Sequence, residues 1–185
     1  MNRQKLIEMH LIFGSFLIPV VTMFAITGAL YSFKITGNYE TKKSEIEIPQ
    51  AVSPDLDQLV IIARKFISEN SLAEPSGNPS IKKMGQVWQL EWTGSRLDFL
   101  LEPTDNPLKL SVSIKQTTWH RFFVQLHKAK GGYAFKLLAA VAAFGLILLL
   151  VSGWFMAQFN PKYKKIRLIA FLSGLLVFVL AAVVS

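Results

Sequence analysis

The sequence contains no cysteine, and this absence removes several kinds of chemistry at once. Disulfide bonds, thiolate metal sites, cysteine nucleophiles and covalently attached c-type haem all require a thiol. Histidine is scarce as well, with three residues in a chain of 185. The polar middle of the chain also lacks paired carboxylates, a Ser-His-Asp arrangement and a glycine-rich phosphate loop. No hydrolytic or phosphate-binding motif is therefore indicated.

Charged side chains are missing from three long apolar runs. These runs are Leu11–Phe33, Leu137–Phe159 and Leu168–Ser185. About 20 apolar residues cross a bilayer core of roughly 30 Å, so the sequence predicts three transmembrane helices in contact with a lipid bilayer. The first run is longer than the roughly 7–15 apolar residues of a cleaved signal peptide, and no small-residue cleavage site follows it. We therefore expect a retained signal anchor.

The net charge of +8 does not indicate nucleic-acid binding, because the basic residues are dispersed or lie beside the apolar runs. Arg3 and Lys5 precede the first run, and four basic residues follow the second, namely Lys162, Lys164, Lys165 and Arg167. Basic residues that flank membrane helices favour the cytoplasmic side. The sequence thus predicts a multi-pass protein of the bacterial cytoplasmic (inner) membrane. Its N-terminus is expected inside, with residues of about 35–130 and the C-terminus outside.

A small α+β module is predicted between the first two runs. Ser53-Pro54 favours a helix start, because serine is a preferred cap and proline a preferred first helical residue. The next apolar residues recur on one helical face: Leu56, Leu59, Val60, Ala63 and Ile67. Three alternating segments then predict an antiparallel sheet, with one face formed by Trp88, Leu90, Trp92, Leu97, Phe99, Leu101, Leu108, Leu110, Val112 and Ile114. The acids Asp98, Glu102 and Asp105 are expected to be solvated.

These patterns divide the chain into five segments. They are a cytoplasmic N-terminus with the first transmembrane helix (1–34), the extracytoplasmic α+β module (35–118), an interfacial segment with the second transmembrane helix (119–159), a basic cytoplasmic loop (160–167) and the third transmembrane helix (168–185). The fold class is therefore an α-helical membrane protein with a small α+β module between helices 1 and 2.

The histidines are the candidate ligands of a metal or cofactor. His120 and His127 are seven residues apart, so on a helix they share a face, stand roughly 10 Å apart and cannot grip one metal ion. Axial haem ligands approach iron from opposite sides, so each histidine needs a partner from another helix or another chain. His10 lies at the expected cytoplasmic end of the first run, and Met156, near the same end of the second run, is the residue that could face it. Alternatively, each histidine is an interfacial side chain with its nitrogens in water.

The order of these features resembles the PepSY-associated transmembrane helix family over most of the chain. In EMHLIFGSFLIPVVTMFAITGALYSF, a histidine opens the first helix and Thr27-Gly28 lies near its end. The α-then-β module that follows contains an LEPTDN turn. In QLHKAKGGYAFKLLAAVAAFGLILLLVSGWFMA, Leu126-His127 opens the second helix and Ser152-Gly153-Trp154 closes it.

The resemblance implies a PepSY-like extracytoplasmic module, with haem b held by His10 and His127 as iron ligands and with His120 as a further candidate. Larger members of the family have four membrane helices, hold two b-type haems between histidines and reduce iron carried by siderophores, while small members have no known role. The resemblance therefore implies a component of a haem-dependent ferric reductase. This chain departs from the pattern at Leu11, where an arginine is common, and it lacks the fourth helix. Further haem ligands would come from Met156 or from another chain.

The leading interpretation is a membrane electron-transfer protein or subunit that passes electrons outward to an iron complex or a redox partner. It is expected to act as a homo-oligomer or within a membrane complex. One alternative is a non-enzymatic anchor whose module binds a partner protein or peptide at a sheet edge. Another is an accessory subunit that packs through its small residues, Gly145, Ser152, Gly153 and Gly174.

Overall fold

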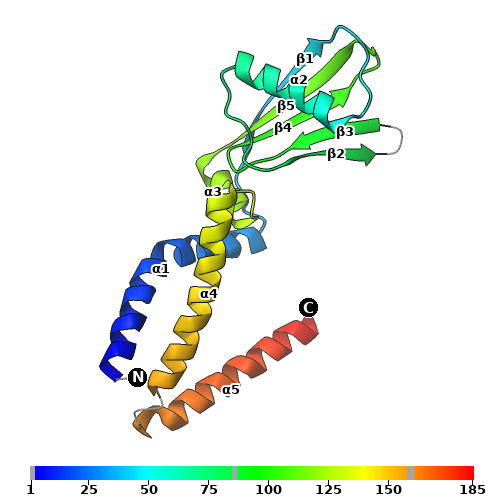
Figure 1. Cartoon of the computed structure of the whole chain (residues 1–185). Helices are drawn as coiled ribbons and strands as arrows, with labels where there is room; N and C mark the ends of the chain where they lie inside the picture. Colours follow the sequence, from blue (N-terminus) through cyan, green and yellow to red (C-terminus); the bar gives the residue numbers. More distant parts are fainter. Residues whose placement is uncertain (1–2, 85–86, 158–160) are drawn as a thin grey trace. The chain divides into compact units, whose positions relative to one another are not determined.

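The structure is a computed structural model that describes residues 3–84, 87–157 and 161–185 (Figure 1). Three of its helices are long and apolar enough to cross a membrane: α1 (Arg3–Ser32), α4 (Tyr133–Met156) and α5 (Pro161–Val184). Their apolar side chains are mostly exposed, as expected for helices that are hydrophobic all round and face lipid. The three predicted transmembrane helices are therefore confirmed, and the chain is a multi-pass membrane protein.

The basic segment 160–167 is predicted to be a loop, and for most of its length this prediction is wrong. Helix α5 begins at Pro161 and includes the basic residues of that segment. Proline suits the first position of a helix because its missing N–H would have no intrahelical acceptor there. The predicted loop residue Asn160 and the predicted end of the second span, Gln158–Phe159, lie outside the described residues.

The chain forms two compact units, and α1 and α4 each contribute to both. The first unit contains residues 1–21 and 140–185, and the second contains residues 22–139. In the first unit, Leu17 of α1 packs against the backbone of Gly145 in α4, and both residues are buried. Glycine suits this contact, because an added Cβ would lie 2.6 Å from Cδ1 of Leu17 and the leucine side chain would have to shift.

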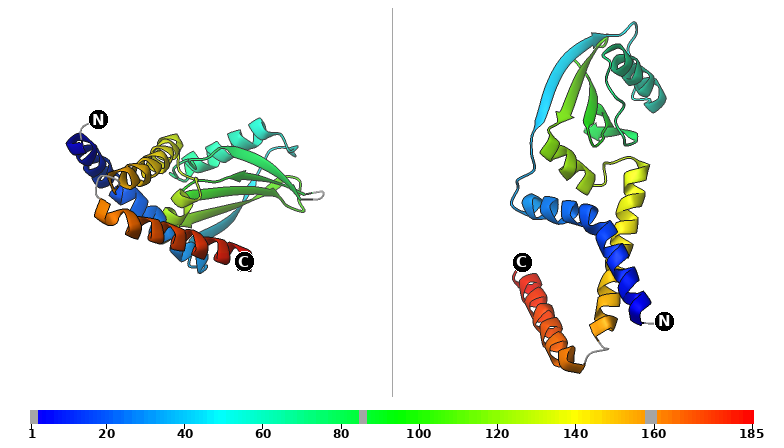
Figure 2. Two further views of the ribbon diagram at one scale, coloured as in Figure 1. Left: turned by 90° about the horizontal axis from the view of Figure 1, so that it is seen from below. Right: turned by 90° about the vertical axis from the view of Figure 1, so that its left-hand side faces the viewer.

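The second unit contains the α+β module. Its antiparallel sheet has the strand order β1-β5-β4-β3-β2, and helix α2 (Leu56–Glu69) covers one face (Figures 1 and 2). The strands are β1 (Tyr39–Glu47), β2 (Pro79–Met84), β3 (Val87–Trp92), β4 (Leu97–Pro103) and β5 (Lys109–Thr117). The predicted α+β class is confirmed, although the sheet has five strands where the sequence predicts three.

The strands β1 and β2, which the hydrophobic pattern does not predict, lie at the two edges of the sheet. Strand β1, YETKKSEIE, is almost entirely exposed, so it carries no apolar alternation. It nevertheless pairs with β5 along its whole length, from Tyr39 opposite Thr117 to Glu47 opposite Lys109. Lysines are common on exposed edge strands because they discourage pairing with another chain. Because these exposed polar residues replace apolar ones, such strands show no hydrophobic periodicity in the sequence.

The predicted core is largely confirmed. Helix α2 contributes Leu59, Ala63 and Ile67 to it. The central strands contribute Leu90, Trp92, Leu97, Phe99, Leu101, Leu110, Val112 and Ile114. Trp88 is half-buried and packs against this cluster. Both tryptophans of β3 therefore belong to the core region of the module.

A short helix, α3 (Trp119–His127), follows the sheet and is separate from the membrane span. Thr118 caps its start, since its hydroxyl accepts a hydrogen bond from the Arg121 amide. The helix ends at His127, and Ala129 then adopts a left-handed conformation with φ of 57°. The predicted interfacial segment is thus a helix of its own, and α4 begins only at Tyr133.

Candidate functional site

His127, the last residue of α3, is hydrogen-bonded to α1. Its Nδ1 lies 2.9 Å from the hydroxyl oxygen of Thr27, which is 5% exposed. The Phe24 ring flanks the imidazole, with the ring centroids 5.2 Å apart. The imidazole therefore has a fixed partner on a neighbouring helix as well as an aromatic neighbour.

Gly28 allows the imidazole of His127 to approach the backbone of α1. A Cβ at this position would lie 3.1 Å from Cε1 of His127, which is closer than ordinary carbon contacts. The Thr27-Gly28 pair thus provides a hydroxyl group for the ring nitrogen and a bare backbone surface for the ring edge. Thr27-Gly28 was noted in the sequence only as part of a family pattern, and the structure gives it a physical role.

His10 on α1 has an equivalent arrangement with α4. Its Nδ1 lies 2.9 Å from the hydroxyl oxygen of Ser152. The next residue, Gly153, lies beside the ring, because an added Cβ would be 3.7 Å from Cε1 of His10. This spacing is ordinary van der Waals contact, so the fit is looser than at Gly28. We call each histidine with its hydroxyl partner a tether: His127–Thr27 and His10–Ser152.

A cavity of about 450 Å³ lies beside the His10–Ser152 tether. Its walls are mainly apolar and include Met9, Phe13 and Phe155. Ser152, one helical turn before the predicted partner Met156, is the residue that hydrogen-bonds His10. His10 therefore presents its ring at an apolar cavity formed by two membrane-spanning helices.

Neither tethered histidine uses its second ring nitrogen within the described part of the chain. Hydrogen bonds involve only Nδ1 of His10 and of His127, and Nε2 is left without a partner there. No group of three or more potential metal ligands occurs among residues 3–84, 87–157 and 161–185. Each ring therefore has one nitrogen, Nε2, that the described residues do not use.

The third candidate, His120, belongs to neither tether. It lies two turns before His127 on α3, and its ring contacts Trp119 with the centroids 5.7 Å apart. Its Nε2 is buried and has no hydrogen-bond partner among the described residues. The structure thus separates His120 from the other two histidines in environment as well as in position.

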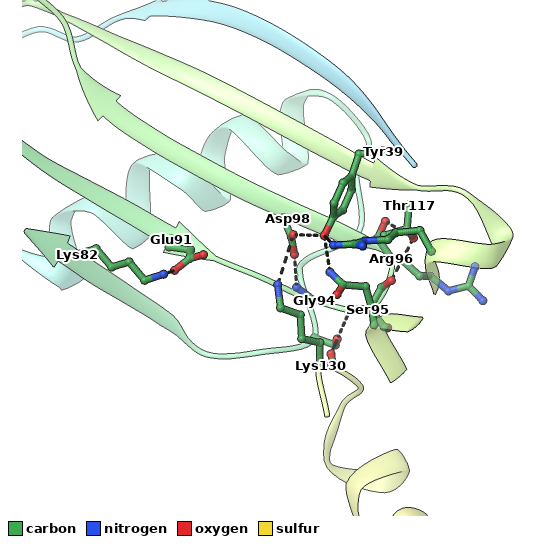
Figure 3. Close-up of polar contacts among 12 residues, drawn as sticks. Tyr39, Lys82, Glu91, Gly94, Ser95, Arg96, Asp98, Thr117 and Lys130 are labelled. Carbon is green, nitrogen blue, oxygen red and sulfur yellow. Dashed lines mark hydrogen bonds and ion pairs between the residues drawn. The ribbon is translucent and has the colours of Figure 1, made fainter. Parts of the chain in front are cut away.

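A buried polar cluster, which the hydrophobic pattern does not predict, joins the sheet to α3 (Figure 3). The expectation that Asp98 is solvated is wrong, because the residue is 6% exposed. Its Oδ2 accepts a hydrogen bond from the Tyr39 hydroxyl at 3.1 Å, and its Oδ1 accepts one from the Gly94 amide at 3.0 Å. The ammonium of Lys130, just after α3, lies 3.5 Å from Oδ2. The carboxylate can be buried because hydrogen bonds and a cation compensate its lost hydration.

The hydroxyl of Tyr39 connects this cluster to α3. It accepts hydrogen bonds from Nε2 of Gln125 at 2.7 Å and from Nη2 of Arg121 at 3.1 Å. Burial raises the pKa of Tyr39, the hydrogen bond from Arg121 opposes this effect, and the negative charge of Asp98 adds to it. The tyrosine is therefore held in its neutral form, in which it can donate to Asp98.

The sequence contains one signal for this cluster. Asp98 stands between Leu97 and Phe99, and such an acid in an apolar strand requires a partner if both faces of the strand are covered. The partners could not be named, because Tyr39 lies 59 residues away and on a strand without a hydrophobic pattern.

The comparisons with known proteins agree with the architecture. The family model for the PepSY-associated TM region matches residues 1–158, and the chain therefore belongs to that family. Helix α5 lies outside the matched residues. No curated protein and no solved structure was found to match the chain.

Proposed function

We propose that this member of the PepSY-associated family is a membrane electron-transfer protein or subunit that binds b-type haem through His10 and His127. One observation carries the proposal: both histidines are tethered through Nδ1, while Nε2 has no partner among the described residues. Metal-bound histidines commonly donate their other ring N–H to a protein acceptor, which orients the ring. The chain has three histidines, and two of them are held in this way on or beside apolar helices.

The residues present fit haem in part, because each site supplies one imidazole and haem accepts one or two axial ligands. A bound b-type haem would supply one-electron transfer at its iron. The chain itself would hold the iron through Nε2, orient each ring through Thr27 or Ser152, and exclude water with apolar helix surfaces. Met156 or a histidine of a second copy would supply a second ligand, since a two-fold axis brings equivalent residues together.

The proposed location is the bacterial inner membrane, with the module on the outer side. The basic residues at the start of α5 favour the cytoplasm, and in that orientation His10 would lie toward the inner face and His127 toward the outer face. Electrons would then pass outward to an iron complex or a redox partner near the module. His120, further from the span than His127 along the chain, would contact a haem propionate or donate a hydrogen bond.

Absorption spectra of the purified full-length chain test this function. Protein from haem-replete cells is expected to show a reduced b-type band. His127→Ala should abolish the band or halve it, according to whether one or two haems bind, and His10→Ala should do the same. His120→Ala is the matched control on α3 and should keep the band while altering its potential. Full haem retention in the His10, His127 double variant would show that the ligands are others.

A non-enzymatic anchor or accessory subunit is the second candidate function. It is favoured by the module itself, whose five-stranded sheet and α2 form a complete core with no metal-ligand cluster among the described residues. In that role the module would bind a partner protein outside the membrane. A colourless preparation that fails to take up added haem would reject electron transfer and favour this role.

A further inference from the structure

We infer that Thr27 and Ser152 are positioning residues that fix His127 and His10 in the tautomer with the proton on Nδ1, so that Nε2 presents its lone pair. The consequence for metal binding rests on the proposed function, whereas the tautomers themselves follow from the hydrogen bonds. Nothing in the composition or periodicity of the sequence assigns these two residues a role.

At the His127–Thr27 tether, the single hydroxyl proton of Thr27 already has an acceptor. The hydroxyl oxygen lies 2.6 Å from the carbonyl oxygen of Met23, one turn earlier in α1. Threonine often donates to this carbonyl in a helix, and 2.6 Å is a short distance for an O–H···O bond. Because the hydroxyl proton has this acceptor, the oxygen is left to accept from His127, and we expect Nδ1 to carry the proton.

The His10–Ser152 tether follows the same reasoning with a weaker constraint. The Ser152 hydroxyl donates to the carbonyl of Leu149 at 3.1 Å, and its oxygen lies 2.9 Å from Nδ1 of His10. The carbonyl contact is longer than the one made by Thr27. We therefore expect the Nδ1–H form to dominate at both histidines, and more completely at His127.

A neutral imidazole has one N–H, so a proton on Nδ1 leaves Nε2 as an acceptor or metal ligand. In many metal sites a carboxylate holds this proton. Here that option is absent, because the sequence has no Asp or Glu after Asp105 and α1 contains only Glu8. A hydroxyl performs the same task without placing a charge in an apolar span, where a charge is expensive.

The glycine that follows each hydroxyl residue completes the arrangement. Gly28 lets the imidazole edge of His127 approach the helix, which brings Nδ1 within hydrogen-bond distance of the hydroxyl, and Gly153 lies beside the ring of His10 at ordinary contact distance. The two tethers lie in different units and their hydroxyl residues lie on different helices, α1 and α4, yet both combine a hydroxyl residue with a following glycine. One arrangement made twice from different sequence segments indicates that the ring orientation is required at each histidine.

The test is histidine ¹⁵N NMR of the full-length apoprotein in nanodiscs. The chain has three histidines, so His120→Ala assigns its own signals and simplifies the spectrum. At alkaline pH, where the imidazole is neutral, long-range ¹H–¹⁵N correlations distinguish the two tautomers. The wild-type spectrum should show the Nδ1–H form for His10 and His127. An Nε2–H form at His127 in the wild type overturns the inference without any variant.

Paired substitutions then test each tether against the other. Thr27→Val keeps the shape and removes the hydroxyl, so the Nε2–H form should appear at His127 while His10 stays unchanged. Ser152→Ala should have the reverse effect, and Thr27→Ser and Ser152→Thr should preserve both tautomers. Unchanged Nδ1–H at His127 in Thr27→Val would show that the hydroxyl does not set the tautomer.

A haem titration separates this inference from the proposed function. Loss of a partner behind a ligating histidine typically weakens binding about 10- to 100-fold, so Thr27→Val should bind haem correspondingly more weakly than Thr27→Ser. Its midpoint potential should also rise, because the imidazole loses a hydrogen bond that increases its basicity. Protein with the expected tautomers that takes up no haem defeats the proposed function alone. Haem binding with equal affinity and potential in Thr27→Val and Thr27→Ser defeats the positioning role alone.

Discussion

The hydroxyl of Tyr39 donates a hydrogen bond to Asp98, with Oη 3.1 Å from Oδ2, although the two residues lie on strands that do not pair with each other. Tyr39 begins β1 and Asp98 lies in β4, with β5 between them. The pair is the centre of the buried cluster that includes Arg121 and Gln125 of α3. It therefore joins the sheet to the helix that carries His127.

Removal of the Tyr39 hydroxyl should destabilise the module. Tyr39→Phe deprives Asp98 of a donor and leaves Gln125 and Arg121 without this acceptor, which costs about 1–3 kcal/mol when the groups stay buried. Urea unfolding of the full chain in nanodiscs, followed through the module tryptophans, measures the loss. Tyr31→Phe is the control, because Tyr31 is 46% exposed and its ring contact with Lys128 survives the change. Equal stability of the two variants would contradict the assigned role of the cluster.

Stability should also fall at alkaline pH through Tyr39. Its pKa in the folded chain is raised above 10.0, mainly by burial, so the folded state holds the proton more tightly than the unfolded state does. This contribution is complete below the unfolded pKa of 10.0 and is lost as pH rises from there through the raised value. The difference in unfolding free energy between wild type and Tyr39→Phe should therefore shrink above pH 10.0. A constant difference across that range would argue against the raised pKa.

Leu90→Asp should unfold the sheet. Leu90 is fully buried in β3, and an unpaired carboxylate at this position costs several kcal/mol. Limited proteolysis should cleave the module of this variant much faster than that of the wild type. Ile61→Asp places the same charge on an exposed position of α2 and should leave the resistance unchanged. Wild-type resistance in Leu90→Asp would contradict the strand register.

Gly145→Val should weaken packing in the first unit. The added carbons would meet the side chain of Leu17, which is 2% exposed and has little room to move. Overpacking of this kind costs about 1–3 kcal/mol. Gly174→Val on α5 is a matched control, since no atom outside its own helix surroundings lies within 4 Å of an added Cβ there. Denaturation in a mixed-micelle titration should distinguish the two, and equal midpoints would show that the Leu17 contact carries no stability.

The fold was predictable where the pattern is local. Charge-free runs such as Leu137–Phe159 identify membrane spans because the bilayer imposes one length and one polarity. The alternation in β3 and β4 likewise predicted residues such as Leu90 and Phe99 in the core. Strand β1 was missed because its pairing with β5 depends on backbone hydrogen bonds, which leave no trace in an exposed sequence.

The candidate site was predictable only in part. The histidines stood out because they are few and lie beside apolar runs. Their hydroxyl partners did not, because the tethers join residues that are 100 and 142 positions apart. Serine and threonine are common in membrane helices, so neither Thr27 nor Ser152 is distinctive until the fold brings a histidine against it.

The left-handed turn at Ala129 lies between α3 and α4. It ends α3 before the membrane span begins, so α3 and α4 are separate helices. Arg121 and Gln125 instead fasten α3 to the sheet through Tyr39. His127 is therefore connected to the sheet through less than three turns of α3 and to α1 through Thr27, so the position of its imidazole depends on both neighbours.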